Sequence, residues 1–233
     1  MIAAAGSGQR LGAGGAKAFV ELAGRPMVEW SLKAFAAAQR VGKIVVAIPP
    51  GAGEPGGALA PGAGEPGGAL APGAVEFVEG GESRSDSVTR ALERVQTEIV
   101  VIHDAARPLV TAELIDGVIA ALEARGDLDG LVAAAPVTDT VKRVDERLTV
   151  VETPERSSLW AVQTPQAFRT EALRRAHAAG DLAAATDDAS LVEAGGTVAV
   201  HPAPPGNLKV TTPLDLRVAE MLLAERPVAP ESP

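Results

Sequence analysis

The chain has 233 residues, enough for one substantial hydrophobic core, so a single domain is expected. Its formal net charge of −9 disfavours a protein that coats nucleic acid, although basic residues could converge on a small anionic substrate. The absence of cysteine excludes disulfides, thiolate catalysis and thiolate metal sites. With neither a run of about 18 apolar residues nor a signal-peptide pattern, a soluble, cytoplasmic protein that binds no membrane is expected.

Short apolar runs alternate with longer amphipathic segments. After a short first strand within residues 1–5, the runs predicted as strands are Lys43–Ile48, Val75–Val78, Ile99–Ile102, Leu131–Ala135 and Thr197–Val200. The segments predicted as helices are Pro26–Gln39, Ser85–Gln96, Thr111–Ala124, Thr170–Ala179, Asp187–Ala194 and Pro213–Ala224, the last with Thr212 as its N-cap. This alternation predicts an α/β fold whose mostly parallel sheet carries helices on both faces.

A glycine-rich turn follows the first strand, in Ala4–Arg10 (AAGSGQR), and Lys17 stands seven residues after the arginine. Glycines allow backbone N–H groups to approach a phosphate, and the two cations would then neutralise it. The turn departs from the dinucleotide pattern at Leu11, and from the Walker pattern because alanines flank Lys17. Two interpretations therefore remain open: a plain strand-to-helix turn, or a phosphate-binding loop that follows neither the dinucleotide nor the Walker pattern.

Three polar segments follow predicted strands: the Gly6–Gly8 turn, His103–Pro108 and Pro136–Lys142. In sheets of this kind, ligands bind at the carboxyl ends of the strands. We therefore expect these segments to share one rim of the sheet.

A series of separated motifs resembles the 2-C-methyl-D-erythritol 4-phosphate cytidylyltransferase family over residues 3–224. The main motifs are Ala4–Lys17, Gly80–Ser87, His103–Pro108, Asp139–Lys142 and Asn207–Thr211. Further matches are Arg156, Leu159-Trp160, Gln163–Gln166, Thr186–Ser190, Pro213 and Asp215-Leu216. The resemblance implies a Rossmann-like nucleotidyltransferase fold with a protruding dimerisation arm at residues 137–160. It also implies CMP transfer from CTP to the polyol phosphate of the non-mevalonate isoprenoid pathway, with release of pyrophosphate.

The resemblance also implies roles for single residues. The CTP contacts would be Ala4, Ala5, Gly6, Gly8, Gly81 and Ser87, and the catalytic cations would be Arg10 and Lys17. The substrate contacts would be Asp104, Arg107, Thr164, Thr186 and Lys209, completed by Thr140 and Arg156 from the neighbouring subunit of a homodimer. Mg²⁺ would be bound mainly through the CTP phosphates, with no metal site of the protein's own.

Three alanines depart from the family pattern. Ala3 replaces a usual proline, and Ala16 and Ala18 flank Lys17 where proline and glutamine are usual. They motivate one alternative, a nucleotide-binding regulator that has lost catalysis, which the retained charged residues of the site argue against. A second alternative is the same chemistry on another polyol phosphate, such as ribitol 5-phosphate.

Several polar residues allow a structural interpretation. Arg84 either pairs with Glu82 or Asp86 at the surface or contacts substrate. His103 is interpreted as a hydrogen-bonded histidine beneath a strand end, His177 and His201 as exposed, and Asp187-Asp188 as a helix N-terminus rather than a metal pair. Trp30 and Trp160 are expected to pack.

Two segments are expected to lack fixed structure. Gly51–Pro61 (GAGEPGGALAP) is repeated without change as Gly62–Pro72, so residues 51–74 should form a mobile loop. The proline-rich residues 227–233 should be a disordered tail.

Overall fold

The computed structural model describes residues 1–6, 17–51, 74–182 and 185–226. The predicted tail lies outside the described residues, as does the predicted loop apart from Gly51 and Ala74.

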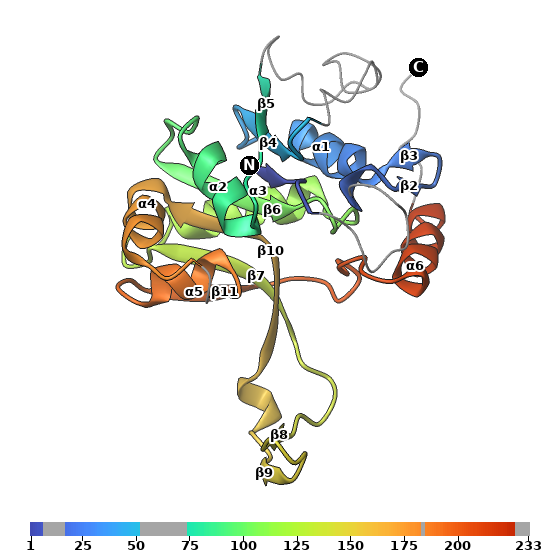
Figure 1. Ribbon diagram of the computed structural model, residues 1–233, viewed down its shortest axis with the longest axis vertical. Helices are drawn as coiled ribbons and strands as arrows, with labels where there is room; N and C mark the ends of the chain where they lie inside the picture. The colour runs from blue at the N-terminus through green and yellow to red at the C-terminus, as the bar shows by residue number, and fades with distance from the viewer. Residues whose placement is uncertain (7–16, 52–73, 183–184, 227–233) are drawn as a thin grey trace.

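A seven-stranded sheet forms the centre of the molecule, in the order β11-β7-β10-β6-β1-β4-β5 (Figure 1). Its strands are β1 (Ile2–Ala3), β4 (Ile44–Ile48), β5 (Val75–Glu79), β6 (Ile99–Asp104), β7 (Gly130–Pro136), β10 (Trp160–Arg169) and β11 (Val198–Pro202). All pairings are parallel except those of β10, which is antiparallel to β6 and β7. The predicted mostly parallel sheet is confirmed.

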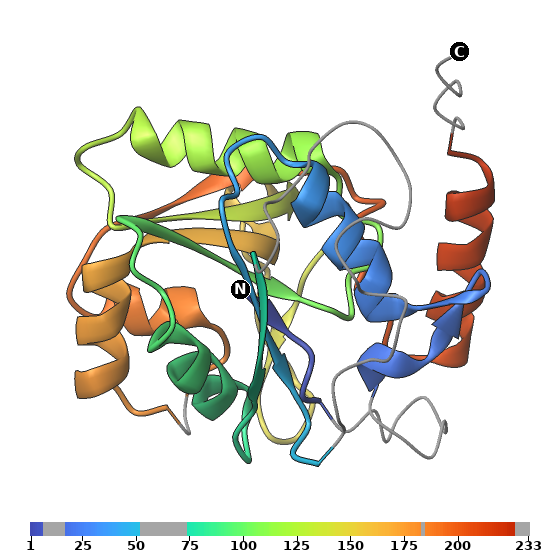
Figure 2. The same cartoon turned by 90° about the horizontal axis from the view of Figure 1, so that it is seen from above.

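Helices cover both faces of the sheet, as predicted (Figure 2). Helices α1 (Met27–Ala37) and α3 (Ala112–Glu123) pack on one face, where Phe35 and Ile115 share a hydrophobic core with Val46 of β4. Helices α2 (Arg84–Leu92), α4 (Thr170–Ala179) and α5 (Asp188–Glu193) cover the other face, where Val88 and Leu173 pack with Val45. Val45 and Val46 point to opposite faces because side chains alternate along a strand.

The last helix lies apart from the two main layers. Helix α6 (Pro213–Ala224) packs through Ala219 on Leu22 and Met27, beside the hairpin of β2 (Glu21–Leu22) and β3 (Arg25–Pro26). Thr212 caps it with a capping box to Asp215, as predicted. Helix α2 ends at Leu92, earlier than the predicted Gln96.

Strand β10 was not predicted, because its sequence shows neither an apolar run nor a clean alternation. Gln163, Thr164 and Gln166 are all buried in it, at 7%, 4% and 1% exposure. Its register on β7 shifts between Val162 and Gln166, in the stretch where these polar side chains lie. The strand is therefore held by pairing with β6 and β7, by hydrogen bonds of its polar side chains, and by Ala167 and Phe168, which are buried in the two hydrophobic cores near its end.

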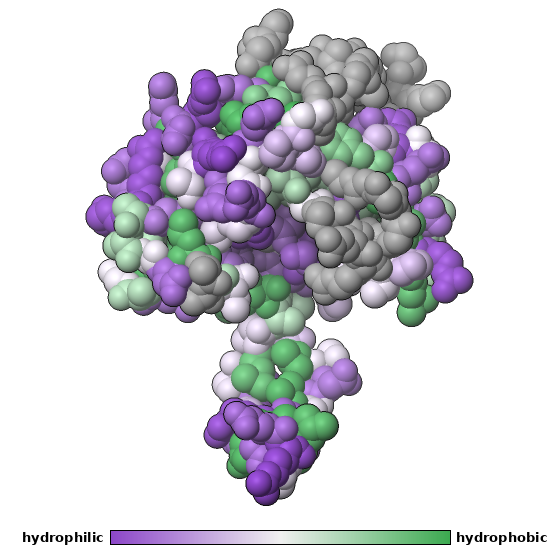
Figure 3. Space-filling model, in the orientation of Figure 1, coloured by the Kyte–Doolittle hydropathy of each residue, from purple (hydrophilic) through white to green (hydrophobic). Residues whose placement is uncertain are grey.

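An arm projects from the body between β7 and β10 (Figure 1). It carries β8 (Arg143–Val144), β9 (Val150–Glu152) and the 3₁₀ helix η3 (Arg156–Ser158). Apolar side chains are exposed on it, led by Leu148 at 80% and Val150 at 54% (Figure 3). This projection lies where the resemblance implies the dimerisation arm.

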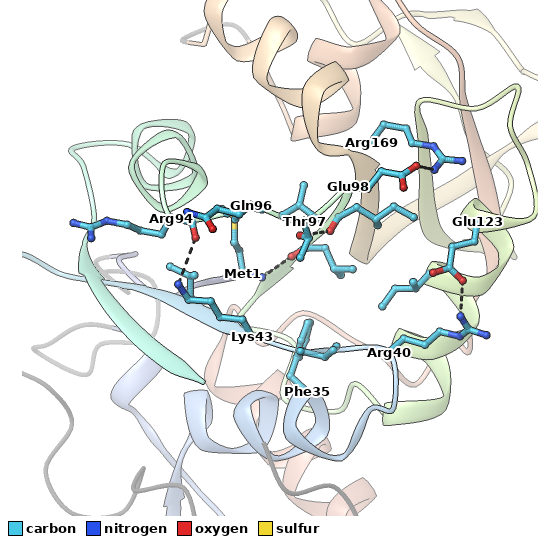
Figure 4. Close-up of a pocket in the computed structure, with 18 residues that line it drawn as sticks. Met1, Phe35, Arg40, Lys43, Arg94, Gln96, Thr97, Glu98, Glu123 and Arg169 are labelled. Atoms are coloured by element: carbon cyan, nitrogen blue, oxygen red, sulfur yellow. Dashed lines mark hydrogen bonds and ion pairs between the residues drawn. The ribbon is translucent and has the colours of Figure 1, made fainter. Parts of the chain in front are cut away.

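A cavity of about 440 Å³ opens at the amino ends of the central strands (Figure 4). Strand β1 is short, as predicted, and the Met1 amino group donates to the carbonyl of Val101 over 2.6 Å inside this cavity. Charged side chains at the cavity pair with one another, as in Arg169 with Glu98 at 2.8 Å. None of the predicted site residues within the described ranges lines it.

Candidate active site

A second cavity, of about 530 Å³, lies at the carboxyl edge of the sheet. Its walls come from the end of β1 and the residues after it (Ala3–Gly6), the end of β6 (Asp104–Ala106), the turn that precedes α2 with the first turn of that helix, and four residues from elsewhere, Lys17, Ala18, Lys209 and Thr211. Residues far apart in sequence therefore meet where ligands of parallel sheets bind, as the sequence predicted.

The two described ends of the glycine-rich turn are tied together. The backbone N–H of Lys17 donates to the carbonyl of Gly6 over 3.0 Å, and Ala4 N–H donates to Ala47 of β4 over 2.8 Å. Ala4, Ala5, Gly6 and Lys17 all line the cavity. Gly8 and Arg10, which the sequence assigned to CTP binding and catalysis, lie outside the described residues.

The turn before α2 is built around Gly81 and Ser87. The N–H of Gly81 donates to Ser87 Oγ over 3.0 Å, and that hydroxyl donates to the carbonyl of Ser83 over 2.9 Å. A Cβ on Gly81 would lie 2.2 Å from the Cβ of Asp86, so only glycine fits there. Ser83 also caps α2 and lines the cavity, so the positive end of this helix borders it.

Asp104, at the end of β6, holds two cations at the cavity wall. Its Oδ1 accepts from Arg84 Nε over 2.9 Å, and its Oδ2 accepts from Lys209 Nζ over 2.6 Å. Burial acts to raise the pKa of Asp104, but the charges of Arg84 and Lys209 outweigh it and hold this pKa well below its usual range. The carboxylate is therefore ionised at neutral pH.

Two sequence interpretations are wrong here. Arg84 does not pair with Glu82 or Asp86, because its Nη1 donates to Asp188 Oδ2 over 2.7 Å while its Nε reaches Asp104. His177 is not exposed, since only 3% of its side chain is accessible beside Asp188. Both errors arise because the true partners lie on other elements, out of reach of local spacing.

Beneath Asp104, a histidine supports the end of β6. His103 Nδ1 lies 2.9 Å from Thr164 Oγ1, and that oxygen accepts the backbone N–H of Asp104 over 3.1 Å. His103 Nε2 lies 3.2 Å from the carbonyl of Arg107. Burial lowers the pKa of His103 to about 3, so the ring is neutral, with a hydrogen on Nε2 for this carbonyl. His103 is thus the hydrogen-bonded histidine predicted from sequence, and Thr164 is buried rather than open to the cavity.

Arg107 binds two backbone carbonyls, one in β10 and one in the segment between β11 and α6. It donates to Asn207 over 2.8 Å and to Val162 over 3.3 Å. Buried Asn207 in turn donates to Gln163 Oε1 over 2.9 Å and to the carbonyl of Thr164 over 2.8 Å. These bonds tie the segment that carries Lys209 to β10, a structural role for Asn207 that the sequence did not reveal.

Comparison with known proteins assigns the family. The family model described as 2-C-methyl-D-erythritol 4-phosphate cytidylyltransferase matches residues 1–225. The chain belongs to this family. A relative of that name from Symbiobacterium thermophilum is 46% identical over 230 residues, covering 97% of this chain and 92% of its own. One from Parasynechococcus marenigrum is 45% identical over 231 residues, covering 97% of each chain.

Solved structures agree with this assignment. The crystal structure of the cytidylyltransferase from Thermus thermophilus superimposes with a TM-score of 0.72 at 35% identity, covering 96% of this chain and 97% of that one. The 4-diphosphocytidyl-2C-methyl-D-erythritol synthase from Anaerococcus prevotii gives a TM-score of 0.79 at 27% identity, with 96% of each chain covered. The predicted fold class and the nucleotidyltransferase assignment are therefore confirmed.

Five of the described residues that the sequence assigned to the site do not line the cavity: Arg107, Thr140, Arg156, Thr164 and Thr186. Thr140 and Arg156 are exposed on the arm, where Arg156 Nη1 donates to the carbonyl of Thr138 over 2.9 Å. Thr186 is exposed just before Asp187, which caps α5 by accepting from Ser190 N–H. Asp187 thus begins a helix, as the sequence favoured over a metal pair.

The described part of the chain offers no cluster of three or more His, Asp or Glu side chains that could hold a metal ion. Among the same residues, no helix has the length and apolar character needed to cross a membrane.

Proposed function

We propose that this chain transfers CMP from CTP to 2-C-methyl-D-erythritol 4-phosphate and releases pyrophosphate. One observation supports this most strongly: the cavity at the carboxyl edge brings Lys17, Arg84 and Lys209 around the end of β1 and the start of α2. These three cations face two carboxylates in the lining, Glu82 and Asp104, so the described lining has a positive excess that suits anionic substrates in a protein of net charge −9.

In the proposed reaction, a phosphate oxygen of the polyol phosphate attacks the α-phosphorus of CTP. The new P–O bond forms while the bond from the α-phosphorus to the bridging oxygen breaks, and that electron pair leaves with pyrophosphate. The attacking phosphate is already ionised at neutral pH, so no general base is needed. Catalysis then rests on positioning the anions and on neutralising the charge of the transition state.

The residues divide into two groups under this proposal. Lys17, with Arg10, neutralises the triphosphate, and the backbone of Ala4–Gly8 and Gly81 binds CTP. Asp104 accepts hydrogen bonds from the polyol hydroxyls, and Lys209 and Arg107 bind its phosphate. Ser87 and Thr164 act through the turn and strand end that they support, since their hydroxyls already bond to Gly81 and Asp104.

We infer that Mg²⁺ arrives bound to the triphosphate. The described side chains fit no separate metal site, and Asp104 is already occupied by two cations. The ion would neutralise phosphate charge, and it would be held by the phosphate oxygens rather than by a described side chain. We expect the reaction in the cytoplasm, where CTP is available.

We also propose a homodimer in which the arm reaches the neighbouring subunit. Exposed apolar side chains on the arm, including Leu148, Val150 and Val151, favour burial against a partner. Thr140 and Arg156 would then complete the partner's site, with Thr186 as a further contact from the chain's own body.

The test is pyrophosphate release with CTP, Mg²⁺ and each of two polyol phosphates in turn. We expect turnover with 2-C-methyl-D-erythritol 4-phosphate and at least tenfold less with ribitol 5-phosphate, a discrimination of about 1.4 kcal/mol. Lys43→Ala serves as a control variant in this assay. It removes a lysine that lines the cavity at the amino ends of the strands and not the candidate active site, so its turnover should match that of the wild type. Faster turnover with ribitol 5-phosphate would show that this is the substrate instead. Absence of pyrophosphate release with both polyol phosphates would contradict the proposal.

A further inference from the structure

A ring of polar contacts lies behind the candidate active site. Arg84 Nη1 donates to Asp188 Oδ2 over 2.7 Å, and Arg84 Nε donates to Asp104 Oδ1 over 2.9 Å. Asp188 Oδ1 lies 3.1 Å from His177 Nε2. His177 Nδ1 lies 3.0 Å from the hydroxyl oxygen of Thr89, which is on the same helix as Arg84. The contacts therefore run from α2 through α5 and α4 and back to α2.

Asp188 and His177 are outside the cavity lining, and their side chains are only 1% and 3% exposed. A carboxylate so deeply buried is stable only when its oxygens have donors. Asp188 has one donor on each oxygen, Arg84 on Oδ2 and His177 on Oδ1. Removing the histidine donor would leave a buried oxygen without its partner.

The direction of the hydrogen bond between His177 and Asp188 follows from chemistry. An ionised carboxylate only accepts, so His177 Nε2 carries the hydrogen that faces Asp188. This bond fixes the carboxylate plane of Asp188. A guanidinium is rigid and planar, so holding Arg84 at Nη1 also fixes the direction of its Nε toward Asp104.

We propose that His177 is a positioning residue for the polyol phosphate site, acting through Asp188 to hold Arg84 against Asp104. The inference rests on the role proposed above for Asp104 in binding the polyol. Without the histidine donor, the carboxylate of Asp188 turns and Arg84 loses its fixed direction. Asp104 then keeps Lys209 as a donor but loses Arg84. The consequence is weaker binding of the polyol phosphate, with little change in the CTP site.

Two substitutions of His177 make a matched pair. Gln places its amide nitrogen near the position of Nε2 and keeps a donor for Asp188, whereas Asn places it near Nδ1 and does not. His177→Asn should raise KM for 2-C-methyl-D-erythritol 4-phosphate about tenfold, as expected for losing one hydrogen bond to a charged group. His177→Gln should keep that KM within about threefold, and kcat and the KM for CTP should stay within about threefold in both variants.

A crystal structure of each variant supplies a readout that needs no turnover. Arg84 Nε should leave Asp104 in His177→Asn and remain within hydrogen-bond distance in His177→Gln. If the wild type shows no turnover with the polyol phosphate, the proposed function fails, while this comparison still decides whether His177 positions Arg84.

Three results would overturn the inference: equal behaviour of the Asn and Gln variants, a fall in kcat with unchanged KM, or an Arg84–Asp104 contact that survives in His177→Asn. Thr89→Val covers the case in which His177→Asn does not fold, because it removes the hydroxyl beside Nδ1, together with that hydroxyl's bond to the carbonyl of Ser85 one helical turn earlier, and leaves His177 in place. It should raise the same KM about threefold, and an unchanged KM would count against the ring.

Discussion

The pair of cations on Asp104 can be tested by removing its charge with Asp104→Asn. The carboxylate is 10% exposed and accepts from Arg84 at 2.9 Å and from Lys209 at 2.6 Å. Breaking a fully buried ion pair costs about 3–5 kcal/mol, whereas exposed pairs contribute about 0–1 kcal/mol. Because Arg84 and Lys209 are 30% and 43% exposed and Arg84 keeps Asp188, we expect a loss between these limits.

The expected loss of unfolding free energy is therefore about 1–2 kcal/mol at pH 7, which lowers Tm by roughly 2–8 °C for a chain of this size. The effect should depend on pH. Since the pKa of Asp104 lies below its unfolded value of about 3.9, its stabilisation is present above that value and is lost as pH falls toward the folded pKa. The gap between wild type and variant should shrink below about pH 4.

Urea unfolding followed by circular dichroism at pH 7 and at about pH 3.5 would measure both effects. Asp127→Asn is a matched control, because Asp127 also accepts from an arginine, Arg125, but is 61% exposed. It should leave the midpoint unchanged. An unchanged midpoint for Asp104→Asn at pH 7, or a gap of equal size at both pH values, would refute the reasoning.

Three further predictions concern catalysis, assembly and the repeat. Lys17→Ala and Arg10→Ala should each lower kcat about a hundredfold, or about 3 kcal/mol, without unfolding; near-normal turnover of folded Lys17→Ala would exclude its catalytic role. Mixing inactive Arg156→Ala with inactive Lys17→Ala subunits should restore part of the activity if the site is shared, and absence of rescue after verified subunit exchange would contradict the shared site. Deleting residues 62–72 should change stability by less than about 1 kcal/mol, since loop closure entropy grows only logarithmically; a tenfold rise in KM for CTP would show that the repeat belongs to the site.

Local signals were sufficient for most of the fold. Strand β4 is an unbroken apolar run, and Thr111 and Thr212 cap helices that begin where predicted. Each of these signals is contained within one element. The short hairpin of β2 and β3 and the strands of the arm escaped prediction because two or three residues carry no periodic pattern.

Part of the candidate site also followed from sequence. Lys17, Gly81, Asp104 and Lys209 line one cavity. The rule for the carboxyl edge of parallel strands led us to expect Asp104 there, whereas Gly81 and Lys209 were assigned through the family resemblance. These residues could be assigned to one site although they are far apart in sequence, because each belongs to a distinct motif. The resemblance also implied roles that stay predictions, above all the contribution of Arg156 from a neighbouring subunit.

The sequence by itself determined the alternation of strands and helices, the helix caps and the family to which the chain belongs. Only the tertiary structure decided the place of β10 and the partners of buried charges. Arg84 had two acidic neighbours within two residues, yet it binds Asp104 and Asp188, which the fold brings to the start of α2. The physical reason is that a buried ion pair depends on desolvation and orientation, and both are set by how distant elements pack.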